Sequence, residues 1–207
     1  MQNTAGIKPK RTALLTKDYI LIGVFTVLIY IVNAVIGMAM TPLIGITAMP
    51  LIAGVCLFFS SVVYLIMAMK VGKRGTMLLF ALVTGLFYTM MGVPFMLAFL
   101  AVAGFLGELA LLGGGVRAYR SFIRQSIAFG VYGMMFGLGS FAMVYIYGGA
   151  ALQDMFAPQT LEAIIGFSQS PLWMIGSALF TFVLTLLGCL LGKSLLRKHF
   201  VKSGMIR

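Results

Sequence analysis

Residues 50–92 read PLIAGVCLFFSSVVYLIMAMKVGKRGTMLLFALVTGLFYTMMG, which is two apolar runs joined by one short basic turn. The turn carries Lys70, Lys73 and Arg74, and neither apolar run contains a charged residue. An apolar run of about 20 residues is long enough for a helix to cross the hydrocarbon core of a bilayer. Basic residues between two such runs favour the cytoplasmic side. The stretch therefore predicts two membrane helices with a cytoplasmic turn between them.

The same rule extends to the whole chain, because all fifteen Lys and Arg residues fall into four clusters separated by long apolar stretches. If each stretch crosses the bilayer twice, every basic residue stays on the cytoplasmic side. This pattern predicts an all-α polytopic membrane protein with six transmembrane helices and both termini in the cytoplasm. The four clusters are Lys8, Lys10, Arg11 and Lys17; Lys70, Lys73 and Arg74; Arg117, Arg120 and Arg124; and Lys193, Arg197, Lys198, Lys202 and Arg207.

Composition agrees with a membrane protein of the cell membrane. Hydrophobic residues make up 61% of the chain and charged residues 9%, whereas about 25% of the residues of a soluble domain are charged. The net charge of +11 lies in juxtamembrane groups that attract anionic headgroups, so no nucleic-acid partner is predicted. We expect one membrane domain over 1–207, with a cytoplasmic segment at 1–18, the bundle at 19–192 and a basic cytoplasmic tail at 193–207.

The lengths of the apolar runs, and the glycine, proline and basic residues that separate them, place the helices at 19–40, 50–69, 77–91, 93–112, 127–147 and 172–191. The first run is longer than the apolar region of a signal peptide and is read as a helix. Between the last two helices, residues 148–170 are partly polar and carry Asp154 and Glu162. A segment that can pack but not span is typical of a lid, and an exposed connector is the alternative.

No enzyme is predicted. The single histidine, His199, lies in the basic tail, so it has no second histidine for a metal site and no nucleophile to support. Cys56 and Cys189 lie in apolar runs without metal-ligand spacing, which favours buried thiols. Glu108 is the one acid inside a predicted helix. We expect it to reach the inner interface or pair with Arg117 or Arg120, although buried acids are also functional candidates.

Glycine spacing predicts close helix contacts. Gly130, Gly133 and Gly137 share a face of one helix, and Gly188 and Gly192 form a GxxxG pattern in the last helix. Packing within the bundle and docking on another membrane subunit both explain such faces. The residues assigned here to docking are Gly23, Thr26, Gly37, Gly188 and Gly192.

Methionine and aromatic residues gather toward the predicted outer side. Nine of the sixteen methionines lie near outer helix ends or in outer loops, namely Met38, Met40, Met49, Met90, Met91, Met96, Met143, Met155 and Met174. Thioethers adapt to flat ligands and can bind haem iron, although they also serve as flexible core filler, and Tyr and Trp also occupy membrane interfaces. The predicted substrate pocket consists of Asn33, Met38, Met40, Tyr88, Met91, Phe95, Tyr145, Tyr147, Gln153, Asp154 and Trp173. No dedicated metal site is assigned.

Three segments resemble the Trep_Strep family of integral membrane proteins. They are KDYILIGVFT at 17–26, NAVIGMAMTP at 33–42, and GFLGEL at 104–109 followed by Arg117, Tyr119, Arg120 and Ser121. The resemblance covers roughly residues 17–200. The first helix of this chain differs from that of many substrate-binding subunits. It offers Gly23, Thr26 and the Asn33/Gly37 pair in place of an AxxxA pattern.

The resemblance implies a substrate-binding S component of an energy-coupling factor (ECF) transporter. Such a six-helix subunit captures a micronutrient in an outward pocket, docks on a T component and depends on two cytoplasmic ATPases, which fits the lack of a phosphate-binding loop here. Haem is the first ligand that it suggests, as cargo rather than as an intrinsic cofactor, and a vitamin or vitamin precursor comes next. A non-transport membrane scaffold or assembly subunit is the alternative.

Overall fold

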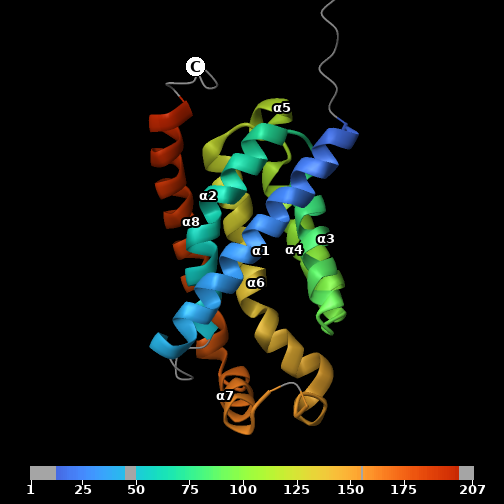
Figure 1. The fold of residues 1–207 in the computed structure, drawn as a ribbon, viewed down its shortest axis with the longest axis vertical. Helices are drawn as coiled ribbons and strands as arrows, with labels where there is room; N and C mark the ends of the chain where they lie inside the picture. Colours follow the sequence, from blue (N-terminus) through green and yellow to red (C-terminus); the bar gives the residue numbers. More distant parts are fainter. Residues whose placement is uncertain (1–12, 45–49, 155, 201–207) are drawn as a thin grey trace, which may run out of the picture.

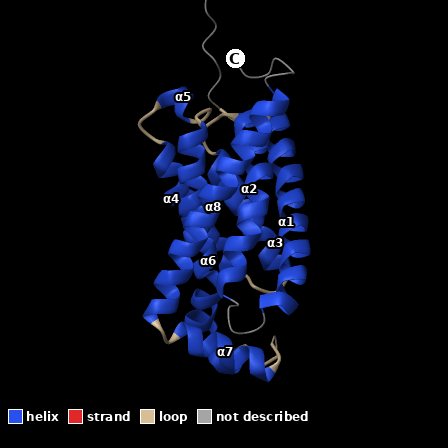
Figure 2. Cartoon of the chain, turned by 90° about the vertical axis from the view of Figure 1, so that its left-hand side faces the viewer, coloured by secondary structure: helices blue, strands red, loops and turns tan. Residues whose placement is uncertain are grey.

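The computed structural model describes residues 13–44, 50–154 and 156–200. These residues form helices and connecting turns, and Figure 2 shows no strand among them. The all-α prediction is confirmed. The helices are α1 (Thr16–Ile44), α2 (Ile52–Val71), α3 (Thr76–Met90), α4 (Phe95–Leu111), α5 (Gly115–Ala118), α6 (Phe122–Ala151), α7 (Pro158–Ser168) and α8 (Pro171–Phe200).

Four of these helices, α1, α2, α6 and α8, are long and apolar enough to cross a membrane. Helices α3 and α4 are also apolar and have 15 and 17 residues. The chain is therefore a polytopic membrane protein. All six predicted helices are present. Those at 19–40, 127–147 and 172–191 are longer than predicted, because α1, α6 and α8 have 29, 30 and 30 residues in all and include flanking sequence.

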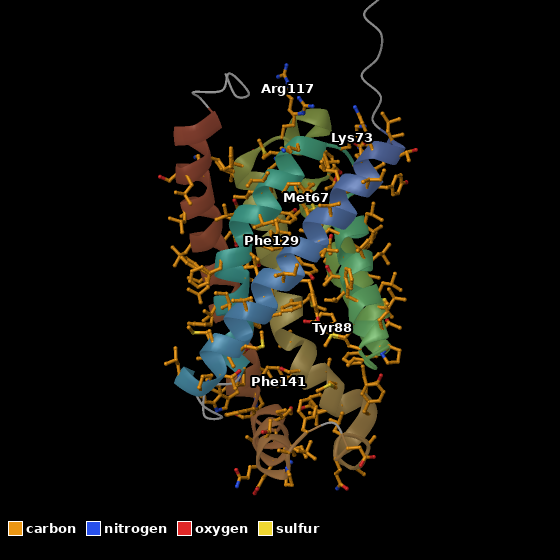
Figure 3. All side chains as sticks on the ribbon, in the orientation of Figure 1. Met67, Lys73, Tyr88, Arg117, Phe129 and Phe141 are labelled. Carbon is orange, nitrogen blue, oxygen red and sulfur yellow. The ribbon has the colours of Figure 1, made fainter. Side chains whose placement is uncertain are left out.

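One end of the bundle collects the basic side chains. The start of α1, the end of α2, the short helix α5 and the end of α8 all lie at the same end in Figure 1. Lys73 and Arg117 mark this end in Figure 3, and α7 lies at the opposite end. The described members of all four basic clusters thus belong to elements that meet on one side, as the charge pattern predicts.

Aromatic stacking fills the middle of the bundle. The rings of Tyr64 and Phe129 are stacked with centroids 3.9 Å apart, and the ring of Tyr132 continues the stack at 5.7 Å from Phe129. All three side chains are buried, as is Phe80, which meets Tyr64 edge-on. The Tyr64 hydroxyl donates a hydrogen bond of 2.8 Å to the Gln125 amide oxygen. The core therefore joins α2, α3 and α6.

The glycine faces lie inside the bundle. A methyl group on Gly130, Gly133 or Gly137 would approach side chains of α8 within 3 Å, which explains the close contact of α6 and α8. A methyl group on Gly188 would collide with the Phe58 carbonyl of α2, and one on Gly192 would crowd Leu65. The docking assignment of Gly188 and Gly192 is therefore corrected: they face α2 of the same chain.

Two carboxylates stabilise the basic end. Glu108 accepts hydrogen bonds from the backbone N–H groups of Gly75 and Met77 at 2.6 and 3.2 Å, so it caps the start of α3. Its expected pairing with Arg117 or Arg120 is wrong, since in the described part of the chain the ion pair joins Asp18 to Lys73. A carboxylate at a helix N-terminus offsets unpaired N–H groups and the helix dipole, and Glu108 thus has a structural role.

The predicted lid at 148–170 contains a helix that its composition did not reveal. Helix α6 is interrupted at Gly148, whose φ of 73° and ψ of 161° are nearly exclusive to glycine. The chain then turns and forms α7, which begins at Pro158, a residue suited to the first helical position. This glycine corner directs α7 across the end of the bundle opposite Arg117 (Figure 1).

Candidate substrate cavity

A cavity of about 410 Å³ lies between the bundle and α7. Tyr88 and Phe141, two of its lining residues, lie in the half of the molecule away from Lys73 and Arg117 (Figure 3). The volume falls in the range of small-molecule sites. The lining residues are Gly37, Thr41, Pro50, Ile52, Ala53, Tyr88, Val93, Phe95, Met96, Phe136, Gly137, Gly139, Ser140, Phe141, Met143, Phe156, Ile164 and Phe167.

The cavity wall is mainly apolar and rich in aromatic rings. Six of its eighteen lining residues are aromatic, two are methionines and three carry hydroxyl groups, those of Thr41, Tyr88 and Ser140. None of the described lining residues carries a charge at neutral pH. Aromatic faces and thioethers suit a flat apolar ligand. The wall therefore favours a ring compound without a buried charge.

Two of the predicted pocket residues line the cavity. Tyr88 contributes from α3, and Phe95 contributes from the start of α4. Gly37, which was assigned to docking, also lines it and leaves room for a ligand beside α1. The prediction of an end-on pocket built from the outer parts of several helices thus has its counterpart in this cavity.

Three predicted aromatic residues lie behind the wall and hold it in place. The Tyr147 ring meets Phe95 edge-on with centroids 5.5 Å apart. The Tyr145 hydroxyl donates a hydrogen bond of 2.5 Å to the Ser168 carbonyl at the end of α7. On α8, the Trp173 ring meets Phe167 at 4.9 Å. These side chains position the cavity wall and are not part of its lining.

Five other predicted residues lie away from the cavity. Met38 is 70% exposed and Met91 60% exposed, and the Met91 sulfur accepts a hydrogen bond from Tyr30. Met40 is half-buried but is not a lining residue. Asp154 is exposed, and Gln153 lines a separate pocket of about 500 Å³ beside Glu162. Position along a helix identified the correct end, but it did not determine which face meets the cavity.

Helix α6 supplies the residues that the sequence prediction missed. Phe136 and Ser140, Gly137 and Phe141, and Gly139 and Met143 are pairs four residues apart, so they share one face of the helix. Their spacing was available in the sequence, but Gly137 also belonged to the predicted packing face with Gly130 and Gly133. The other lining residues that were missed are Thr41, Pro50, Ile52, Ala53, Val93, Met96, Phe156, Ile164 and Phe167.

Asn33 lies one helical turn before Gly37 and is half-buried. Its backbone carbonyl accepts a hydrogen bond from the Cys56 thiol at 3.5 Å. Its side-chain oxygen Oδ1 is buried and has no hydrogen-bond partner among the described residues. The predicted pocket residue Asn33 is thus close to the lining glycine without itself being in the lining.

The family of the chain follows from comparison with known proteins. No curated protein and no solved structure matches it. A model of hypothetical bacterial integral membrane proteins matches residues 16–202, which include all the helices described above. With a match over that length, the chain belongs to the Trep_Strep family of hypothetical bacterial integral membrane proteins.

Proposed function

We propose that this protein is the substrate-capture subunit of an energy-coupling factor importer and that the cavity under α7 binds its cargo. The observation that carries this proposal is the position of the cavity. It lies at the end of the bundle away from the basic clusters and is bordered by α7. A membrane protein that captures a nutrient needs such a site on the side from which the nutrient arrives.

Six membrane crossings fit the arrangement best. Helices α3 and α4 are close to the lower length limit for spanning, and they are joined by the short turn at 91–94. With six crossings, the ends that carry the basic clusters lie in the cytoplasm together with both termini. The cavity and α7 then face the outside of the cell membrane.

The cavity wall favours an uncharged ring compound over haem. Met96, Met143 and Tyr88 offer a thioether or phenol to haem iron. The two carboxylates of haem, however, meet no cationic side chain among the described lining residues, and burying an unpaired charge is costly. A vitamin or vitamin precursor with an uncharged heterocycle meets no such penalty. We therefore place this class before haem as the cargo.

Docking on a T component is assigned to the outer stripe of α1. Ile20, Val24 and Ile31 are exposed along this stripe, and a methyl group on Gly23 would have no neighbour within 4 Å. Thr26 is buried and its hydroxyl donates to the Ile22 carbonyl, so its assignment to docking is corrected. Two cytoplasmic ATPases would energise this complex.

Copurification and ligand analysis test the proposal. We expect the chain, purified from native membranes in mild detergent, to bring a T component and two ATPases with it. Mass spectrometry of the same sample should identify a retained small molecule. Ser140→Trp, which fills the cavity, should lose the small molecule and keep the partners, whereas Gln159→Trp on the exposed face of α7 should keep both. Partners without ATPase subunits would favour the scaffold alternative.

A further inference from the structure

Three buried side-chain oxygens in the described part of the chain have no hydrogen-bond partner, namely Asn33 Oδ1, Thr181 Oγ1 and the Tyr119 hydroxyl. Such atoms are rare in folded proteins and call for a specific explanation. Tyr119 belongs to the basic end, where burial and the nearby Glu108 carboxylate raise its pKa to about 12. The other two oxygens belong to residues of α1 and α8 that neighbour glycines of the cavity wall.

Thr181 lies directly behind a glycine of the cavity wall. Its side chain is fully buried on α8. A methyl group on Gly137 would lie 2.7 Å from Thr181 Oγ1, and Gly137 lines the cavity. Because glycine has no side chain, nothing on residue 137 itself shields this hydroxyl from the space in front of it.

Asn33 lies one helical turn from a second glycine of the wall. Gly37 lines the cavity and lies four residues after Asn33 on the same face of α1. Both residues are next to Cys56, whose sulfur is 3.5 Å from the Asn33 backbone carbonyl and 3.9 Å from a methyl group built on Gly37. The two unpartnered oxygens thus belong to residues of α1 and α8 that neighbour glycines of one cavity.

We propose that Asn33 Oδ1 and Thr181 Oγ1 form a hydrogen-bonding subsite for an N–H or O–H group on an uncharged ring ligand. This inference rests on the proposed function of the cavity. An amide oxygen accepts hydrogen bonds only, and a threonine hydroxyl both donates and accepts. The described lining residues include no carboxylate to neutralise an ammonium group, so the donor belongs to a neutral amide, amine or hydroxyl. Metallated haem, whose ring nitrogens carry no hydrogen, would leave both oxygens unpaired.

The first test needs no ligand. A buried oxygen without a hydrogen-bond partner destabilises the empty protein. Replacing it with an apolar group of similar shape should therefore not lower the stability of the empty protein. We expect Asn33→Leu and Thr181→Val to keep the apo melting temperature or raise it by about 2–4 °C. The matched control is Thr185→Val, one turn further along α8, because the Thr185 hydroxyl donates to the Thr181 carbonyl at 2.7 Å. Its melting temperature should lie below that of Thr181→Val.

The second test compares two probes that differ only in the substituent on one nitrogen, which is hydrogen in one probe and methyl in the other. N-phenyl-1-naphthylamine has an apolar ring body and one N–H group, and its N-methyl derivative lacks that group. Binding in lipid nanodiscs is followed by quenching of Trp173, the only tryptophan of the chain, which contacts Phe167 of the cavity wall. Wild-type protein should bind the secondary amine about three- to tenfold more tightly.

The variants decide between the outcomes. Asn33→Leu and Thr181→Val should abolish the preference for the secondary amine while leaving the affinity for the N-methyl derivative unchanged. An unchanged preference in both variants, or lower apo stability in both, overturns the subsite but leaves the cavity as a binding site. Because Ser140→Trp adds a second tryptophan, binding to this variant is followed by the fluorescence of the probe itself. Failure of Ser140→Trp to remove saturable binding of either probe overturns the proposed function of the cavity itself.

Discussion

Trp173 meets Phe167 edge-on, with ring centroids 4.9 Å apart and an angle of 64° between the rings, and this contact joins α8 to the wall that α7 contributes to the cavity. A second contact near the same end of α7 is the hydrogen bond from Tyr145 to Ser168. The two contacts hold α7 over the cavity from α8 and from α6. We expect the strength of these two contacts to control how readily α7 moves away from the cavity.

Removing the aromatic contact should speed ligand exchange. Trp173→Ala loses an aromatic pair worth about 0.5–1.5 kcal/mol beyond area burial, so the dissociation rate of the retained ligand should rise about three- to tenfold. Stopped-flow displacement measures this rate. Leu172→Ala is the matched control, since Leu172 directly precedes Trp173 in the first turn of α8 and is 81% exposed. An unchanged rate in Trp173→Ala would show that α7 does not limit exchange.

Removing the hydrogen bond should have a smaller effect of the same sign. Tyr145→Phe keeps the ring and deletes the donor to the Ser168 carbonyl. The net loss of about 0.5–1.5 kcal/mol should appear as faster hydrogen exchange of the α7 backbone, measured by mass spectrometry. Protection of α2 should not change, because its core contacts are distant from α7. Equal loss of protection in both helices would indicate global destabilisation in place of local opening.

The membrane topology can be tested by thiol labelling. A cysteine at Gln159, exposed on α7, should react with an impermeant reagent in intact cells, and one at Arg117, exposed on α5, should react only after lysis. The native Cys56 and Cys189 are buried and give a low background. Labelling of residue 117 in intact cells would contradict the cytoplasmic placement of the basic end.

Charge distribution and apolar length were sufficient to predict an all-α polytopic membrane protein. The four basic clusters predicted the common end of the bundle, and the apolar runs predicted each long helix, because burial in lipid leaves little choice of local structure. Helix α7 was not predicted, because its eleven residues are short and partly polar. Its position depends on Gly148 and on contacts with Tyr145 and Trp173, which neither charge distribution nor apolar length indicates.

The cavity was only partly predictable. The position of Tyr88 and Phe95 along their helices predicted that they line the cavity. Residues at the same height in the bundle point in different directions, however, and Met38 and Met91 point away. The direction depends on how each helix is rotated against its neighbours. On α6 that rotation follows from Gly130, Gly133 and Gly137 contacting α8. A glycine face that packs on one side thus leaves Phe136, Ser140 and Met143 on the side of the cavity.

Glycine substitutions should separate bundle packing from subunit docking. Gly188→Leu places a side chain against the Phe58 carbonyl, where backbone cannot yield easily, so overpacking should cost about 3 kcal/mol or more and abolish ligand binding and transport together. Gly23→Leu has open space and should retain ligand binding while reducing copurification of the T component. Ligand binding by isolated protein and pull-down of partners measure the two effects. Normal pull-down with Gly23→Leu would move the docking surface away from this part of α1.

Replacing Glu108 should lower the stability of the fold and leave the affinity for cargo unchanged. Glu108→Ala leaves the N–H groups of Gly75 and Met77 without their carboxylate, which should cost about 1–3 kcal/mol. Glu108→Gln retains one acceptor and should cost less, because only the charge and one oxygen are lost. Thermal unfolding in detergent should therefore rank wild type above Glu108→Gln and Glu108→Ala last, while the ligand affinity of the folded fraction stays constant. A loss of affinity in Glu108→Gln without a loss of stability would place cargo at the basic end of α4, because a capping role changes stability first.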